Sequence, residues 1–204
     1  MLATSPIEAQ VIHNCAKHAI NHILQEDKVE LGCLCSLWTP DHLIPVADRK
    51  DGNWGVKTIQ YALSDVFNFR TDIYMNHGGK IWTKDKQALN ADIANQDLIG
   101  FILNIKYFTF SGKGKNKTKQ EHRHFISLHN KWTGCYPGGG AAPQFTYLES
   151  ILADDTRQPR WGCGSFKDIM DWANSEYEIV AMIPIFKKRD VDNNVVSYVC
   201  SGCN

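Results

Sequence analysis

The chain has 204 residues, of which 43% are hydrophobic and 11% aromatic, enough for one well-buried core but too few for two ordinary domains. Lys and Arg together number 22, as do Asp and Glu, so a formal net charge of +0 gives no bulk electrostatic reason to bind nucleic acid or an anionic membrane. The densest apolar run, residues 98–105, is far shorter than the roughly 20 residues of a membrane-spanning helix, so no membrane span is expected.

The beginning of the chain and its cysteines indicate where the protein works. Residues 1–10 lack the charged and apolar regions of a secretory signal, and seven unevenly spaced cysteines indicate reduced thiols rather than a disulfide framework. We therefore expect an intracellular, cytoplasmic protein, with a secreted, disulfide-bonded one as the alternative. A single domain over residues 1–190 and a peripheral tail over residues 191–204 are the predicted organisation.

Helical periodicity dominates the first half of the chain. Apolar residues recur every three or four positions from Cys15 to about residue 24, with Asn14 placed to cap the helix. A second apolar stripe predicts a helix over residues 55–69, and a shorter helix is predicted over residues 84–96.

The pattern then changes to that of a β-hairpin. Residues 98–110 and 124–132 are rich in β-branched and aromatic residues, and they flank a polar, glycine-containing segment, residues 111–122. This arrangement predicts two antiparallel strands joined by an exposed loop.

The last elements complete an α+β pattern. A helix is predicted around residues 147–155, a second over residues 165–176 with Ser165 as its N-cap, and a final strand over residues 178–186. Helices come first and antiparallel strands follow, so the predicted fold class is α+β.

Cys15 stands where a helix start can activate a thiol. The partial positive charge of a helix N-terminus favours a thiolate over a thiol. Gln10 precedes the cysteine by five residues, so a loop could place its amide beside the sulfur and form an oxyanion hole with the Cys15 amide. His124, at the start of a predicted strand, is the candidate base. The alternative is a cysteine that only fills the core and a structural histidine.

These residues resemble a known family. Gln10, followed by the run CAKHAINHILQ from Cys15, is similar to the signature that opens the Josephin domain, the papain-like deubiquitinase module of ataxin-type proteins. Residues 52–67, 124–132 and 176–185 resemble further segments of that family in the same order along the chain.

The resemblance implies a papain-like architecture with N-terminal helices packed on an antiparallel sheet. It also implies a cysteine-dependent deubiquitinase that acts on ubiquitin or ubiquitinated proteins and needs no cofactor and no metal. In this interpretation Cys15 is the nucleophile, His124 the general base and Gln10 the oxyanion donor.

The residue that orients the histidine is left open. The family has Asn or Asp four residues after the tryptophan of the histidine strand, and this chain has Tyr136 there. Asn130 or Gln144 could serve through a register shift, or Cys15 and His124 could act as a dyad. Loss of activity would leave a non-catalytic ubiquitin-binding module, and another papain-like peptidase or amidase is a further alternative.

Two other groups could bind a metal. His18 and His22 lie one helical turn apart, but no third ligand is evident nearby, so a structural role is favoured. Two further pairs of cysteines are close neighbours in sequence, Cys33 with Cys35 and Cys200 with Cys203. A four-thiolate zinc site or a redox role for them is a weaker hypothesis, because only Cys200 and Cys203 have the spacing of a zinc half-site.

Overall fold

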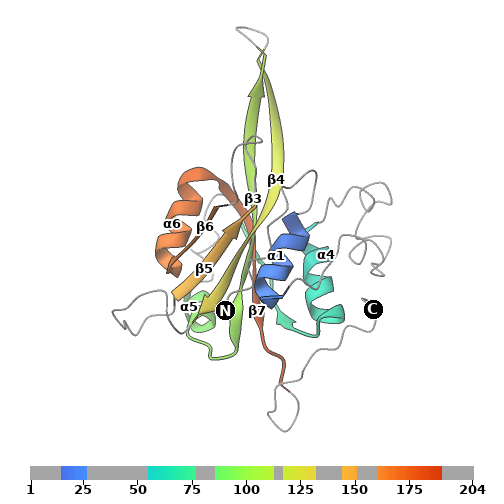
Figure 1. Ribbon diagram of the computed structural model, residues 1–204, viewed down its shortest axis with the longest axis vertical. Helices are drawn as coiled ribbons and strands as arrows, with labels where there is room; N and C mark the ends of the chain where they lie inside the picture. The colour runs from blue at the N-terminus through green and yellow to red at the C-terminus, as the bar shows by residue number, and fades with distance from the viewer. Residues whose placement is uncertain are drawn as a thin grey trace.

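The computed structural model describes residues 15–26, 55–76, 86–112, 117–131, 144–150 and 160–189. These residues form an α+β fold in which helices cover both faces of one open antiparallel sheet (Figure 1). The predicted α+β class is therefore confirmed. The predicted tail over residues 191–204 lies outside the described residues. None of the described helices is long and apolar enough to cross a membrane.

The helices lie where the apolar periodicity predicts them. The described α-helices are α1 (Cys15–Leu24), α4 (Val56–Tyr61), α5 (Lys86–Ile93) and α6 (Phe166–Glu176). The π-helical turn η1 (Ala62–Val66) continues α4 directly.

The sheet has seven strands. Its strands are β1 (Arg70–Thr71), β2 (Tyr74–Met75), β3 (Leu98–Ser111), β4 (Thr118–Lys131), β5 (Gln144–Glu149), β6 (Arg160–Ser165) and β7 (Glu178–Phe186). The strand order is β1-β7-β3-β4-β5-β6, with β2 also paired to β7, and every pairing is antiparallel.

Each face of the sheet has its own core, because successive side chains of a strand point to opposite faces. Helices α1 and α4 pack on the face that carries Ile102, Phe125 and Ile183. Helices α5 and α6 pack on the face that carries Ile126 and Phe145. Burial on both faces explains why β3 and β7 read as continuous apolar runs rather than alternating ones.

Two sequence predictions about this region were wrong. Residues 118–122, predicted as loop, belong to β4, and His122 pairs with Tyr107 of β3. Residues 147–149, predicted as the start of a helix, are the end of β5, which pairs with both β4 and β6. Strand β6 was not predicted at all. Pairing with strands distant in sequence outweighs the local helical preference of this short segment.

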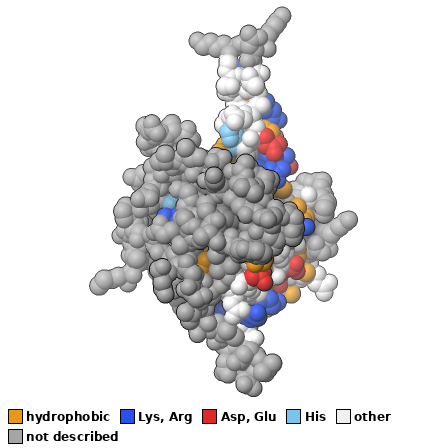
Figure 2. All heavy atoms as spheres, turned by 90° about the vertical axis from the view of Figure 1, so that its right-hand side faces the viewer, with side chains coloured by type: hydrophobic (Ala, Val, Ile, Leu, Met, Phe, Trp, Pro, Cys, Tyr) orange, Lys and Arg blue, Asp and Glu red, His pale blue; other side chains and the backbone are white. Residues whose placement is uncertain are grey.

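Beyond the body of the sheet, β3 and β4 continue as a two-stranded ribbon (Figure 1). The last residue of β3 that pairs with β7 is Lys106, and the first residue of β4 that pairs with β5 is Ile126. Among the described strands, the outer parts of β3 and β4 therefore pair only with each other. Figure 2 shows the ribbon standing clear of the body, with basic, acidic and histidine side chains near its base. The strand that carries His124 therefore leaves the body close to that residue.

Helix α6 begins with the predicted cap. The Ser165 side chain accepts a hydrogen bond from the Asp168 amide at 3.2 Å, so one of the unpaired N–H groups of the first turn is satisfied. We expect Ser165→Ala to lower the free energy of unfolding by about 1 kcal/mol, measured by urea denaturation. Ser175→Ala, a similar change at the other end of the helix, should have a smaller effect. Equal losses would contradict the capping role.

Candidate active site

Cys15 is the first residue of α1, and its side chain is only 8% exposed. Backbone amides of Phe125, Ala16 and Cys15 itself lie close enough to the sulfur to lower the pKa of the thiol. Two of these amides belong to the first turn of the helix and the third comes from β4. The nucleophile predicted from the sequence thus lies where a helix start meets the central hairpin. Gln10 and Asn14 lie outside the described residues.

His124 immediately precedes the strand residue whose amide contacts Cys15. The imidazole is buried, 3% exposed, and no hydrogen bond joins it to Cys15 among the described residues. Instead its Nε2 lies 3.9 Å from Oε1 of Glu149. The charge of His18, one helical turn after Cys15, contributes to lowering the pKa of His124, so the imidazole is within electrostatic reach of α1.

Glu149 is a member of this cluster that the sequence interpretation missed. Its carboxylate is as buried as His124, and it accepts a hydrogen bond from the Tyr177 hydroxyl at 3.3 Å. It is paired with Ile126, two residues after His124, so both side chains occupy the same face of neighbouring strands. A buried carboxylate beside an imidazole can hold the ring in one orientation and stabilise its charged form.

The orienting residues proposed from the sequence lie elsewhere. Asn130 is six residues from His124 on the same strand, about 20 Å away at the rise of a β-strand, and its amide donates to the Leu98 carbonyl at 3.1 Å. Gln144 pairs with Lys131, one residue further along. Neither side chain can reach the imidazole. Tyr136 lies outside the described residues.

Burial controls the protonation of the cysteine and the histidine. Desolvation raises the pKa of the Cys15 thiol to about 11, although the three amides act in the opposite direction. Desolvation, assisted by the charge of His18, lowers the pKa of His124 to about 3. The thiolate expected from the helix start is therefore not the resting form, because the loss of solvation outweighs the helix amides. At neutral pH the site holds a thiol and a neutral imidazole.

The buried neutral imidazole makes stability depend on pH. In the unfolded chain His124 returns to a pKa of about 6.5, so between pH 6.5 and 3 the unfolded state binds more protons than the folded one. The contribution of His124 to the free energy of unfolding is therefore fully present above pH 6.5. Below that pH it decreases, with a slope that approaches about 1.4 kcal/mol per pH unit. Urea denaturation of the wild type and of His124→Leu between pH 7.5 and 4.5 should show a smaller slope in the variant. His122→Ala, on the same strand, should keep the wild-type slope; an unchanged slope in His124→Leu would contradict the assignment.

The second histidine of the predicted metal pair is tied to the sheet. His22 Nδ1 lies 2.9 Å from the Ser127 hydroxyl, and its Nε2 lies 3.3 Å from the Thr146 hydroxyl. Both ring nitrogens therefore face hydroxyl groups, which supports the structural role favoured from the sequence. Among the described residues no group of three or more His, Cys, Asp and Glu side chains could hold a metal. The paired cysteines, Cys33, Cys35, Cys200 and Cys203, lie outside the described residues.

Comparisons with protein-family models, with curated proteins and with solved structures find no match for this chain.

Proposed function

We propose that the protein is a cysteine-dependent deubiquitinase with a Josephin-like, papain-like catalytic domain. The observation that carries the proposal is the contact between Cys15, at the start of α1, and the Phe125 amide, next to His124. A thiol at a helix start, a histidine on a neighbouring strand and a carboxylate on the next strand form the set of groups that thiol acyl transfer needs. The choice of ubiquitin comes from the sequence resemblance alone.

The proposed reaction begins from neutral groups. The Cys15 sulfur attacks the carbonyl carbon of the C-terminal glycine of ubiquitin as its proton passes to His124, which leaves a tetrahedral oxyanion and an imidazolium. The Cys15 amide and the Gln10 side chain are the proposed donors to the oxyanion. Collapse breaks the bond to the lysine nitrogen, which takes the proton from His124 and leaves as an amine. Water then attacks the thioester, with His124 accepting a proton and returning it to the sulfur, and ubiquitin departs with a free carboxylate.

His124 shares its face of the sheet with Ile126 and Glu149, whereas α1 packs on the face that carries Phe125. The substrate complex must therefore bring the imidazole and the sulfur together. Catalytic hydrogen bonds are often long or misaligned before substrate binds. Closure around the extended end of ubiquitin would align the ring while Glu149, 3.9 Å from Nε2 in the substrate-free protein, stays beside it. A carboxylate in this position stabilises the imidazolium that forms during both steps.

The role of Glu149 can be tested with an isosteric change. Glu149→Gln keeps the volume and a hydrogen-bonding oxygen but removes the charge that stabilises the imidazolium, so we expect kcat/KM to fall by about 10²-fold or more. Gln144→Ala, on the same strand but out of reach, should change kcat/KM less than about twofold. Steady-state hydrolysis of a fluorogenic ubiquitin C-terminal amide measures both. Similar values of kcat/KM in Glu149→Gln and the wild type would show that Glu149 does not orient His124 for catalysis.

A non-catalytic ubiquitin-binding module is the second candidate, and the buried, high-pKa thiol favours it. Intact mass after incubation with ubiquitin carrying a C-terminal electrophile separates the candidates. A mass increase of one ubiquitin supports the enzyme. Binding of ubiquitin without adduct formation supports the module, and reaction only with a short peptide electrophile supports another papain-like peptidase or amidase.

A further inference from the structure

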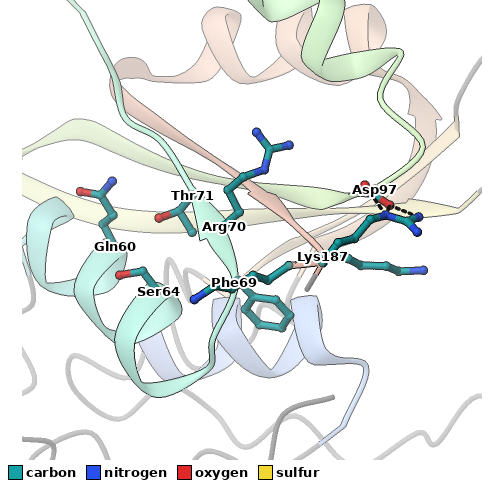
Figure 3. Close-up of a pocket in the computed structure, with 9 residues that line it drawn as sticks. Gln60, Ser64, Phe69, Arg70, Thr71, Asp97 and Lys187 are labelled. Atoms are coloured by element: carbon teal, nitrogen blue, oxygen red, sulfur yellow. Dashed lines mark hydrogen bonds and ion pairs between the residues drawn. The ribbon is translucent and has the colours of Figure 1, made fainter. Parts of the chain in front are cut away.

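A hollow of about 640 Å³ lies at the end of the sheet opposite the β3–β4 ribbon. It is bounded by α4 and η1, by β1, by the turn before β3 and by the residues that follow β7 (Figure 3). Its lining side chains are mostly polar or basic: Gln60, Ser64, Phe69, Arg70, Thr71, Asp97, Lys187, Lys188 and Arg189. We refer to this set as the basic hollow.

The one acidic side chain of the basic hollow is already neutralised. Arg189 donates three hydrogen bonds to the Asp97 carboxylate. Its Nε lies 2.9 Å from Oδ1 and 2.8 Å from Oδ2, and its Nη2 lies 2.5 Å from Oδ1. The pKa of Asp97 is lowered by the hydrogen bond from Arg189, with further contributions from the charges of Arg189, Lys187 and Arg70. Three cations therefore act on one carboxylate, and that carboxylate cancels only one of them.

Two of the three remaining cations contact neutral groups. Arg70 stacks its guanidinium on the Phe186 ring, 4.0 Å from the centroid, so the edge that carries its donors stays available. Lys188 donates to the Asn68 side-chain oxygen at 2.9 Å, which leaves its charge uncancelled. Lys187 follows Phe186 and forms no ion pair with any residue that the structure describes. With Arg189 offset by Asp97, the lining keeps three positive charges.

Neutral polar groups complete the wall, of which the Ser64 hydroxyl already donates to Asp65 at 2.7 Å. Figure 3 shows Gln60, Ser64 and Thr71 at one side of the hollow, the Asp97–Arg189 pair at the other, and Arg70 and Lys187 coming from neighbouring segments between them. A ligand in this space would meet positive charges and hydroxyl or amide groups from several segments. A planar carboxylate uses few of these donors, whereas a tetrahedral dianion can accept from many at once.

We propose that the basic hollow binds a phosphate group, carried as a monoester on a larger molecule. The uncancelled charge and the polar groups along the wall suit a dianion, and the volume exceeds what a single phosphate fills. This site is separate from Cys15. Along β3, the residue beside Phe186 is Leu98 and the residue beside His124 is Ile105, seven positions and about 23 Å away. The inference does not depend on the proposed deubiquitinase activity.

The test measures inorganic phosphate and O-phosphoserine binding by isothermal titration calorimetry on the full chain, at constant ionic strength set with sodium chloride. We expect both anions to bind the wild type. The Arg70→Gln/Lys187→Gln variant should bind them at least about tenfold more weakly, since each substitution removes a charge-assisted contact. Lys57→Gln/Lys167→Gln removes two exposed lysines outside the hollow and should bind as the wild type does. Cys15→Ala should also bind normally.

Each result bears on the proposal. Tighter binding of O-phosphoserine than of phosphate supports a monoester, and equal binding supports free phosphate as the ligand of the same site. If Arg70→Gln/Lys187→Gln proves unstable because the Phe186 stack is lost, Lys187→Glu keeps that stack and should still weaken binding at least tenfold. The proposal is overturned if the wild type binds neither anion, or if the hollow variants bind both as tightly as the two-lysine control.

Discussion

Cys15→Ala should abolish covalent capture by ubiquitin with a C-terminal electrophile and lower hydrolysis to the uncatalysed background. No other group in the described site can form the acyl-enzyme, so the loss should exceed about 10³-fold in kcat. Alanine fills less space than cysteine but keeps the helix start, and the side chain it replaces is small. The fold should survive, which circular dichroism and the urea midpoint can verify.

Cys163 provides the matched control for this change. It is a free and exposed cysteine on β6, whereas Cys15 is free and buried at the start of α1. Exposure alone would make Cys163 the more reactive thiol toward a small alkylating agent such as iodoacetamide, and the high pKa of Cys15 adds to that contrast. Capture by the ubiquitin electrophile should show the reverse preference, because binding of ubiquitin places its end at Cys15. Peptide mapping of the adduct to Cys163 or Cys135 would refute the assignment.

The parts of the site that the sequence predicted are those governed by local pattern. The apolar spacing after Cys15 is enough to predict α1, and the β-branched runs on either side of a polar segment are enough to predict the β3–β4 hairpin. The alternation of side chains along β4 places His129 on the α1 face, 6.1 Å from the His22 ring, and His124 on the opposite face beside Glu149.

The parts that were missed are set by contacts between distant segments. Glu149 becomes a partner of His124 only because β5 pairs with β4 in a register that aligns it with Ile126. The helical interpretation of residues 147–155 concealed it, although Thr146 and Tyr147 are typical strand residues. The resting protonation of Cys15 was misjudged for a related reason. A helix start can be recognised in a sequence, but the burial that opposes it depends on the packing of α1 against the sheet.

His124→Ala should lower kcat/KM by roughly 10²- to 10⁴-fold, the range expected for loss of a general base. The effect should be large because the Cys15 thiol, with a pKa of about 11, is almost fully protonated at neutral pH and cannot attack until a base takes its proton. The imidazole, with a pKa lowered to about 3, is in the form that accepts it.

His129→Ala removes a histidine from the opposite face of the same strand and should cost less than about tenfold. Both variants need to be compared at matched fractions folded, since removal of a buried side chain also affects stability. Added imidazole should restore part of the activity of His124→Ala by entering the space left behind, and should not stimulate Cys15→Ala. A large loss in His129→Ala with little in His124→Ala would place the base on the α1 face, and the pairing of His124 with Glu149 would then be purely structural.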